Sequence, residues 1–289
     1  MKISAFTNFV CPVEGLSLLR SANSLHCVKG HNFDVAREGY CNLLLVQQKK
    51  TLNPGDNKEM VAARGRFLGG GHFTRIADKL FEIVGTIVAE SKGSGHLRIV
   101  DAGCGEGYYL DQLRKRAVDS NFSATLELAG FDISKWALKA AAKRSTDIAW
   151  AVAGNRQLPF AAGSINLILS MFGFADWESF KTVLAKNGQV LLVDPGPDHL
   201  IELRKIIYPT VNVSPLPPAS KAIASGFILQ REESLKFSIS LKNSSQIQDL
   251  LAMTPHAFRI TAKARKELEA LKHLTVTVDV VFRILRVDN

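Results

Sequence analysis

The sequence predicts an α/β fold, in which a doubly wound, mostly parallel sheet follows a small N-terminal module. Short apolar runs alternate with helical patterns between residues 72 and 207, as in chains whose parallel strands are joined by crossover helices. A glycine-rich turn joins the first of these runs to a helix. Residues 227–241 and 274–287 alternate apolar and polar side chains, which predicts terminal antiparallel strands.

Composition and charge narrow the class of protein. The chain has 289 residues, 46% hydrophobic and 22% charged, as expected for a globular protein with a full core. No apolar stretch approaches the ~20 residues of a membrane helix, and the N-terminus lacks the pattern of a secretory signal. We therefore expect a cytoplasmic protein with no membrane partner. The net charge of +9 suits a nucleic-acid partner, although many basic enzymes have none.

The N-terminal module contains two close pairs of candidate metal ligands. Cys11 and Glu14 form one pair, and Cys27 and His31 form the other. Tetrahedral zinc is commonly bound by two such pairs, although glutamate is an uncommon ligand in structural sites. The alternative is a module without metal that packing holds together. His26 and Cys41 are substitute ligands, but the apolar run around Cys41 favours a core residue there.

The first part of the α/β pattern contains the glycine-rich turn. Helices are expected over residues 60–68 and 72–89, and a buried strand over 97–101. Asp101 ends this strand, and glycines follow at alternate positions before a helix over about 107–118: Gly103, Gly105 and Gly107. Glycines at a strand-to-helix turn let backbone N–H groups approach a ligand closely.

A second acid agrees with this interpretation. Asp132 ends the next strand, 126–131, and lies 31 residues after Asp101. In a strand–helix–strand unit, a carboxylate at this point accepts hydrogen bonds from the hydroxyls of a ribose. The alternative is that Asp132 caps the following helix, a role that Ser134 could also fill. The two strand ends together predict a Rossmann-like nucleoside-cofactor site.

The remaining elements continue the alternation. Helices are expected over 134–144, 176–186, 201–207 and 245–251, strands over 148–152, 165–171 and 189–193, and irregular structure over 208–220. Ligands bind beyond the carboxyl ends of parallel strands, so the Asp-Pro-Gly-Pro-Asp-His turn at 194–199 should face the cleft. Three residues after strand ends are candidate proton acceptors, among which the sequence does not choose: Asp176, Asp194 and His199.

Several motifs occur in order along the chain. They are the Cys/His pairs, Gly-His-Phe at 71–73, Asp-Ala-Gly-Cys-Gly-Glu-Gly-Tyr-Tyr at 101–109, the 194–199 turn, and Met-Thr-Pro-His-Ala-Phe-Arg at 253–259. From Cys11 to about residue 285, the chain resembles the bacterial 23S rRNA guanine-N1-methyltransferases. The resemblance implies a small zinc-knuckle-like module joined to a class I methyltransferase domain that uses S-adenosylmethionine. Glu14 departs from it, because the family has a cysteine there.

The resemblance also implies site residues. The implied cofactor-binding set is Phe73, Asp101, Gly103, Gly105, Glu106, Asp132, Asn155 and His199. Either Asn155 or Gln157 could contact the adenine. His199 could instead be a surface or helix-start residue, and Phe73 could simply be a core residue. The implied zinc ligands are Cys11, Glu14, Cys27 and His31. No catalytic residue is assigned.

We expect a zinc module at 1–45, a connector at 46–71 and the methyltransferase domain at 72–289. Basic side chains near the connector are candidate phosphate contacts or simply a solvated face: Lys49, Lys50, Arg64 and Arg66. The expected partner is 23S rRNA, and a homodimer is the expected assembly to test. A small-molecule methyltransferase and a non-catalytic RNA-binding protein of the same fold are the alternatives.

Overall fold

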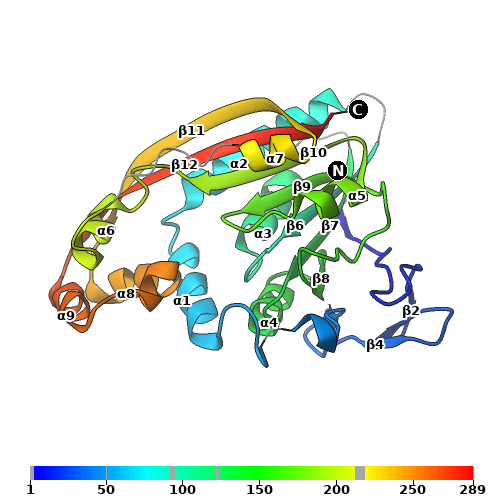
Figure 1. Ribbon diagram of the computed structural model, residues 1–289, viewed down its shortest axis with the longest axis horizontal. Helices are drawn as coiled ribbons and strands as arrows, with labels where there is room; N and C mark the ends of the chain where they lie inside the picture. Colours follow the sequence, from blue (N-terminus) through cyan, green and yellow to red (C-terminus); the bar gives the residue numbers. More distant parts are fainter. Residues whose placement is uncertain (1–2, 50, 92–94, 121–123, 212–218, 289) are drawn as a thin grey trace.

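A large, mostly parallel sheet organises the molecule (Figure 1). The computed structural model describes residues 3–49, 51–91, 95–120, 124–211 and 219–288. Within these residues, nine strands form one sheet in the order β11-β12-β10-β9-β6-β7-β8-β5, and β1 also pairs with β7. The bounds are β1 Ile3–Ala5, β5 Tyr40–Asn42, β6 His96–Ala102, β7 Thr125–Asp132, β8 Ala149–Val152, β9 Ile165–Met171, β10 Leu184–Pro195, β11 Phe227–Leu241 and β12 Leu274–Val287.

The strand directions confirm the expected fold. Strand β6 pairs in parallel with β7 on one side and with β9 on the other, so the winding of the sheet reverses at β6. Such a switch point opens a crevice at the carboxyl ends of the strands. Strands β11 and β12 are antiparallel and end the sheet, as their alternating side chains predict.

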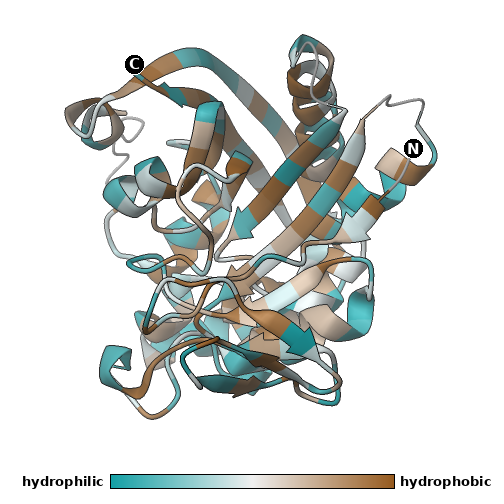
Figure 2. Cartoon of the chain, turned by 90° about the vertical axis from the view of Figure 1, so that its right-hand side faces the viewer, coloured by the Kyte–Doolittle hydropathy of each residue, from teal (hydrophilic) through white to brown (hydrophobic). Residues whose placement is uncertain are grey.

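Helices lie on both faces of this sheet, and further helices pack on those helices (Figure 1). They are α1 Lys58–Gly69, α2 Thr74–Glu90, α3 Tyr108–Val118, α4 Lys135–Arg144, α5 Trp177–Val183, α6 Ile201–Ile207, α7 Ser220–Ala224, α8 Ser244–Ala252 and α9 Ala262–Ala270, with short 3-10 turns η1 Val46–Gln48 and η2 Pro255–Phe258. Neighbouring strand residues alternate between two cores: Ile99 packs with α2, α3 and α4, whereas Val100 packs with α5 and the N-terminal residues. The strands are accordingly rich in apolar residues along their length (Figure 2).

The N-terminal residues are divided between two sheets. Strands β2 Leu19–Ser21, β3 Ser24–His26 and β4 Asn32–Asp34 form a small antiparallel sheet at one end of the molecule, opposite α6, α8 and α9 (Figure 1). Strands β1 and β5 instead pair with β7 and β8 of the large sheet. Cys41 lies in β5, buried to 3% exposure, which confirms its assignment to the core. The domain boundary at residue 45 stays a prediction.

Some expected boundaries were wrong. The helix expected to reach residue 186 ends at Val183, because Leu184 pairs with Ile165 in a longer β10 that bulges before Gln189. The segment expected to be irregular partly lies outside the described residues, at 212–218, and its end begins α7 at Ser220. Helix α9 was not predicted. Among the described residues, no helix combines the length and hydrophobicity that crossing a membrane requires.

Candidate active site

A cavity of about 860 Å³ opens where the strands of the switch point end. This volume lies in the usual range of ligand sites, ~300–1,000 Å³. Its walls come from the glycine turn, the ends of β7 to β10, helix α1 and the 253–258 segment. The predicted cofactor residues that line it are Phe73, Gly103, Gly105, Glu106, Asp132, Asn155 and His199.

The glycine turn has the conformation that its sequence predicts. Gly103, Gly105 and Gly107 have φ angles of +75°, +54° and +80°, a region that other residues rarely adopt. A Cβ on Gly107 would lie 2.7 Å from Trp150 and 3.0 Å from the Cβ of Ala141. Backbone conformation and close packing therefore both require glycine at the start of α3.

Three carboxyl groups crowd this turn. Asp101 is 1% exposed and lies beneath the turn without lining the cavity, and its Oδ1 has no hydrogen-bond partner. Burial, and then the neighbouring Asp132 and Glu106, raise the pKa of Asp101 to about 8. Burial also raises the pKa of Glu106, although Arg144 lies 3.0 Å from it. Three carboxyl groups with one paired arginine suit a ligand that carries a positive charge and hydroxyl donors.

The two alternatives for Asp132 are separated by the geometry. Ser134 caps α4 by accepting a hydrogen bond from the Ala137 N–H at 3.2 Å. Asp132 instead accepts hydrogen bonds from the N–H groups of Gly105, at 3.0 Å, and Ser134, at 2.8 Å. It lines the cavity beside the glycine turn. This arrangement holds the carboxylate at the cavity surface. Its ribose role stays a prediction.

Asn155 and Gln157 are separated in the same way. Asn155 lines the cavity and donates its amide to the Phe174 carbonyl. Gln157 points elsewhere and donates to the Pro12 carbonyl at 2.6 Å. Of the two residues, Asn155 is therefore the one that a ligand would meet.

Only one of the three candidate proton acceptors lines the cavity. Asp176 caps α5, and Asp194 pairs with Arg283 at 3.1 Å. His199 lines the cavity, and burial lowers its pKa to about 4. Its Nδ1 accepts the Asp279 N–H at 3.3 Å, which leaves the proton of the neutral ring on Nε2. His199 is therefore suited to donate a hydrogen bond rather than to accept a proton.

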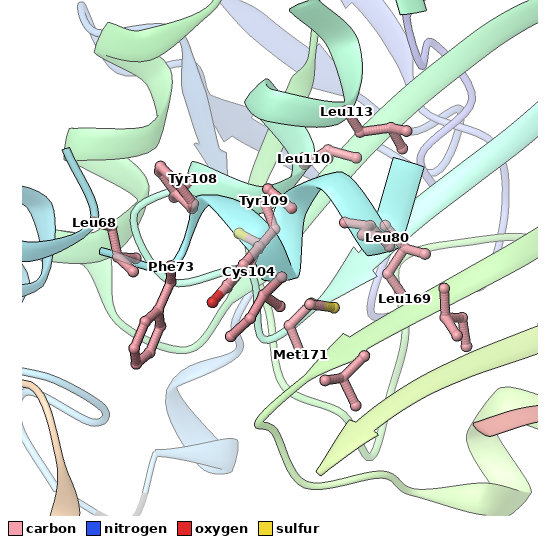
Figure 3. Packing of buried hydrophobic residues seen from close by; sticks show 14 of the residues in the cluster. Leu68, Phe73, Leu80, Cys104, Tyr108, Tyr109, Leu110, Leu113, Leu169 and Met171 are labelled. Carbon is pink, nitrogen blue, oxygen red and sulfur yellow. The ribbon is translucent and has the colours of Figure 1, made fainter. Parts of the chain in front are cut away.

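Helix α1 forms a wall that the sequence did not predict. Met60, Arg64 and Leu68 line the cavity. The Arg64 guanidinium pairs with Asp56 and donates to the Met253 carbonyl at 3.1 Å, so this expected phosphate contact is engaged within the wall. Figure 3 shows Leu68 and Phe73 beside Tyr108 and Tyr109, which form an apolar part of the same wall. Met60, Arg64 and Leu68 are spaced by four and share one helix face, but the spacing alone does not show whether that face meets a cavity or the core.

Two of the other expected phosphate contacts, Arg66 and Lys49, do not line the cavity. Arg66 pairs with Asp249 at 2.6 Å, and Lys49 is half-buried. Lys50 lies outside the described residues.

A second group of candidate ligands lies in the N-terminal module. One ligand atom from each of Cys11, Cys27 and His31 lies within 4.8 Å of the others, and Cys11 Sγ is 3.7 Å from His31 Nδ1. Two thiols and an imidazole are ligands that zinc prefers. Glu14 is exposed and does not join this cluster. The structure therefore brings three of the four predicted ligands together.

The fold and the cavity define a Rossmann-like methyltransferase with a zinc-ribbon module. A methyltransferase-domain family model matches residues 99–196, and a model of the RlmA N-terminal zinc ribbon matches residues 9–52. YxjB of Bacillus subtilis, assigned as a 23S rRNA (guanine-N1)-methyltransferase, is 32% identical over 282 residues, 95% of each chain. The 23S rRNA (guanine(748)-N1)-methyltransferase of Streptomyces fradiae is 32% identical over 194 residues, covering 67% of this chain and 65% of that protein. The chain belongs to the 23S rRNA (guanine-N1)-methyltransferase family.

Proposed function

We propose that this protein transfers a methyl group from S-adenosyl-L-methionine to N1 of a guanine in 23S rRNA, in the cytoplasm. The observation that carries the proposal is the single cavity that joins the glycine turn and Asp132 to a second wall of aromatic and basic residues. Its volume accommodates a nucleoside cofactor and part of a nucleotide together. The names of the relatives support the same substrate.

The glycine turn and the acids fit the cofactor. Asp132 would hold the ribose, Asn155 the adenine, and Gly103 and Gly105 would let the methionine part lie against bare backbone. The orphaned Asp101 oxygen, together with Glu106, favours a cation nearby. When bound, the cofactor supplies an activated methyl group on a positive sulfur.

The other residues position and desolvate the base. Methyl transfer needs an in-line approach of the guanine nitrogen, so orientation is the chief task of the protein. His199 presents an N–H donor between Phe73 and Phe172, whose ring centroids lie 6.2 and 5.9 Å away. A neutral donor suits a carbonyl oxygen, such as the one that a guanine carries beside N1. The aromatic rings around it exclude water from the reacting atoms.

Methyl transfer to hypomethylated 23S rRNA tests the proposal. Tritiated S-adenosylmethionine should label the RNA, and a nucleoside digest should contain 1-methylguanosine. Asp132→Ala should strongly reduce labelling at low cofactor concentration, whereas Glu59→Gln, at an exposed acid on α1, should not change it. Labelling of a metabolite extract but not of rRNA would contradict the proposed substrate. Failure to bind the cofactor in calorimetry would instead favour a non-catalytic RNA-binding protein.

We also propose that Cys11, Cys27 and His31 hold a zinc ion that orders the module. Emission spectroscopy of the purified protein should find one zinc per chain, and Cys27→Ser should lose it. Glu14→Cys restores the family's fourth ligand type and should slow zinc loss to a chelator. An absence of metal in the unaltered protein would contradict this proposal. Sedimentation tests the expected homodimer.

A further inference from the structure

The mouth of the cavity carries exposed aromatic rings. Among the described residues, the exposed aromatic side chains are Phe172, Phe174 and Phe258, at 36%, 91% and 74%, and all three line this one cavity. Phe172 and Phe174 follow β9, whereas Phe258 ends η2, some 84 residues later in the chain. Large apolar side chains gathered in solvent at one place indicate a binding surface rather than core packing.

The segment that carries Phe172 and Phe174 is held in place by hydrogen bonds. Phe172 has a φ of +57°, and its N–H donates to the Val193 carbonyl at 2.9 Å. The next segment is fixed through the Phe174 carbonyl, which accepts the Asn155 amide. The rings therefore project from positioned backbone.

The η2 segment is fixed from two sides. Arg64 donates to the Met253 carbonyl at 3.1 Å, and Tyr208 Oη lies 2.9 Å from His256 Nδ1. These contacts join the base of η2 to α1 and to the end of α6. Phe258 is thus exposed although its own backbone is anchored.

The segment that carries Phe258 is basic as far as residue 266, before Glu267 and Glu269 follow on α9. Residues 253–266 contain no aspartate or glutamate, and their Arg and Lys side chains are exposed: Arg259, Lys263, Arg265 and Lys266. Arg204 of α6 lines the cavity on the same side. Aromatic faces beside a cationic surface match single-stranded nucleic acid, whose bases stack while its phosphates are neutralised. An apolar peptide would need no such charge.

We propose that Phe258 and Phe174 form the stacking subsite that holds the target guanine and its neighbouring nucleotide out of the RNA stack. The inference rests on the proposed function and adds the residues that capture the base. A base within a hairpin must be extruded before its N1 can reach a cofactor, and aromatic rings compensate for the lost stacking. Stacking on these rings does not distinguish one base from another. Polar groups deeper in the cavity would therefore have to select guanine.

Binding and methylation of RNA test this subsite separately. The probes are a short guanine-containing oligoribonucleotide, followed by fluorescence anisotropy with S-adenosylhomocysteine present, and hypomethylated 23S rRNA. Phe258→Ala and Phe174→Ala should each weaken oligonucleotide binding and single-turnover methylation roughly 5- to 150-fold. Phe258→Trp should restore both activities, whereas Phe258→Leu should not. Affinity for S-adenosylhomocysteine should stay within about two-fold.

Leu52→Ala is the matched control, because Leu52 is 93% exposed and does not line the cavity. Equal oligonucleotide binding by Phe258→Ala and Leu52→Ala would overturn the subsite, as would the absence of any binding by the unaltered protein. A shift from dimer to monomer in Phe258→Ala would assign the rings to an interface between copies instead. If the unaltered protein methylates no rRNA, the proposed function fails, and oligonucleotide binding still decides the subsite.

Discussion

The two walls of the cavity differ in construction. The glycine-turn wall is local and little exposed: Gly103, Gly105 and Asp132 come from two successive strand ends of one strand–helix–strand unit. The mouth is assembled from remote segments and exposed: Phe174 follows β9, and Phe258 ends η2. A wall that excludes water must be precise, whereas a wall that captures RNA must remain open. Substitutions in the glycine-turn wall should therefore change protein stability and cofactor affinity. Substitutions at the mouth should change RNA affinity.

The largest effect is expected at Gly107, where strain and collision combine. Gly107→Ala places a Cβ 2.7 Å from Trp150 at a φ of +80°, and should lower the free energy of unfolding by about 3–5 kcal/mol. Gly163→Ala is the matched control, because its φ is +66° but nothing lies within 4 Å. It should cost about 1–2 kcal/mol. Urea denaturation measures both, and equal losses would show that the close packing at the turn is unimportant.

The pH dependence of stability should come next in size. The pKa of His199 is about 4 in the folded protein, and a free histidine has about 6.5, so the unfolded chain binds more protons between these values. Stability from this group is complete above pH 6.5 and is lost as the pH falls toward 4, by about 3 kcal/mol. His199→Gln should remove this rise of stability with pH and leave the opposite slope that the raised pKa of Asp101, about 8, produces in the same window. An unchanged slope would mean that other groups carry the dependence.

Removal of the Asp132 carboxylate should weaken cofactor binding without weakening RNA binding. Asp132→Ala loses charge-assisted hydrogen bonds to a ligand and to the Gly105 N–H, so affinity for S-adenosylhomocysteine should fall about 10- to 100-fold. Oligonucleotide binding should change less than two-fold. Calorimetry and anisotropy provide the two measurements. A parallel loss of both ligands would argue that the cavity is one coupled site.

The smallest effect is expected at the basic rim. Lys266→Ala, at an exposed position on α9, should weaken RNA binding a few-fold and reduce the slope of log affinity against log salt by about 1. Lys186→Ala is the control, because Lys186 is exposed at the opposite, amino-terminal part of β10. Equal slopes for the two variants would show that α9 lies outside the RNA path.

Local sequence patterns determined the glycine-turn wall. Strands β6 and β7, the glycine turn after β6 and the acid at residue 132 were all predicted. Each depends on a short run of residues with a recognisable periodicity or backbone conformation. Terminal strands β11 and β12 also match their predicted bounds, since alternation continues over their whole length. Ser134 and Asp132 stayed ambiguous in the sequence, because both residue types cap helices equally well.

Tertiary structure alone decided the rest. Nothing in the local pattern shows that β1 and β5 leave the N-terminal module to extend the large sheet, because strand pairing depends on partners more than 100 residues away. The sequence left Arg64 as either a phosphate contact or part of a solvated face, yet Asp56 and the Met253 carbonyl hold it within the wall. The aromatic mouth and the convergence of Cys11, Cys27 and His31 likewise became visible only in the folded chain. Short patterns in the sequence thus predicted the residues of the glycine-turn wall, whereas the remaining residues that line the cavity could be identified only after folding brought distant segments together.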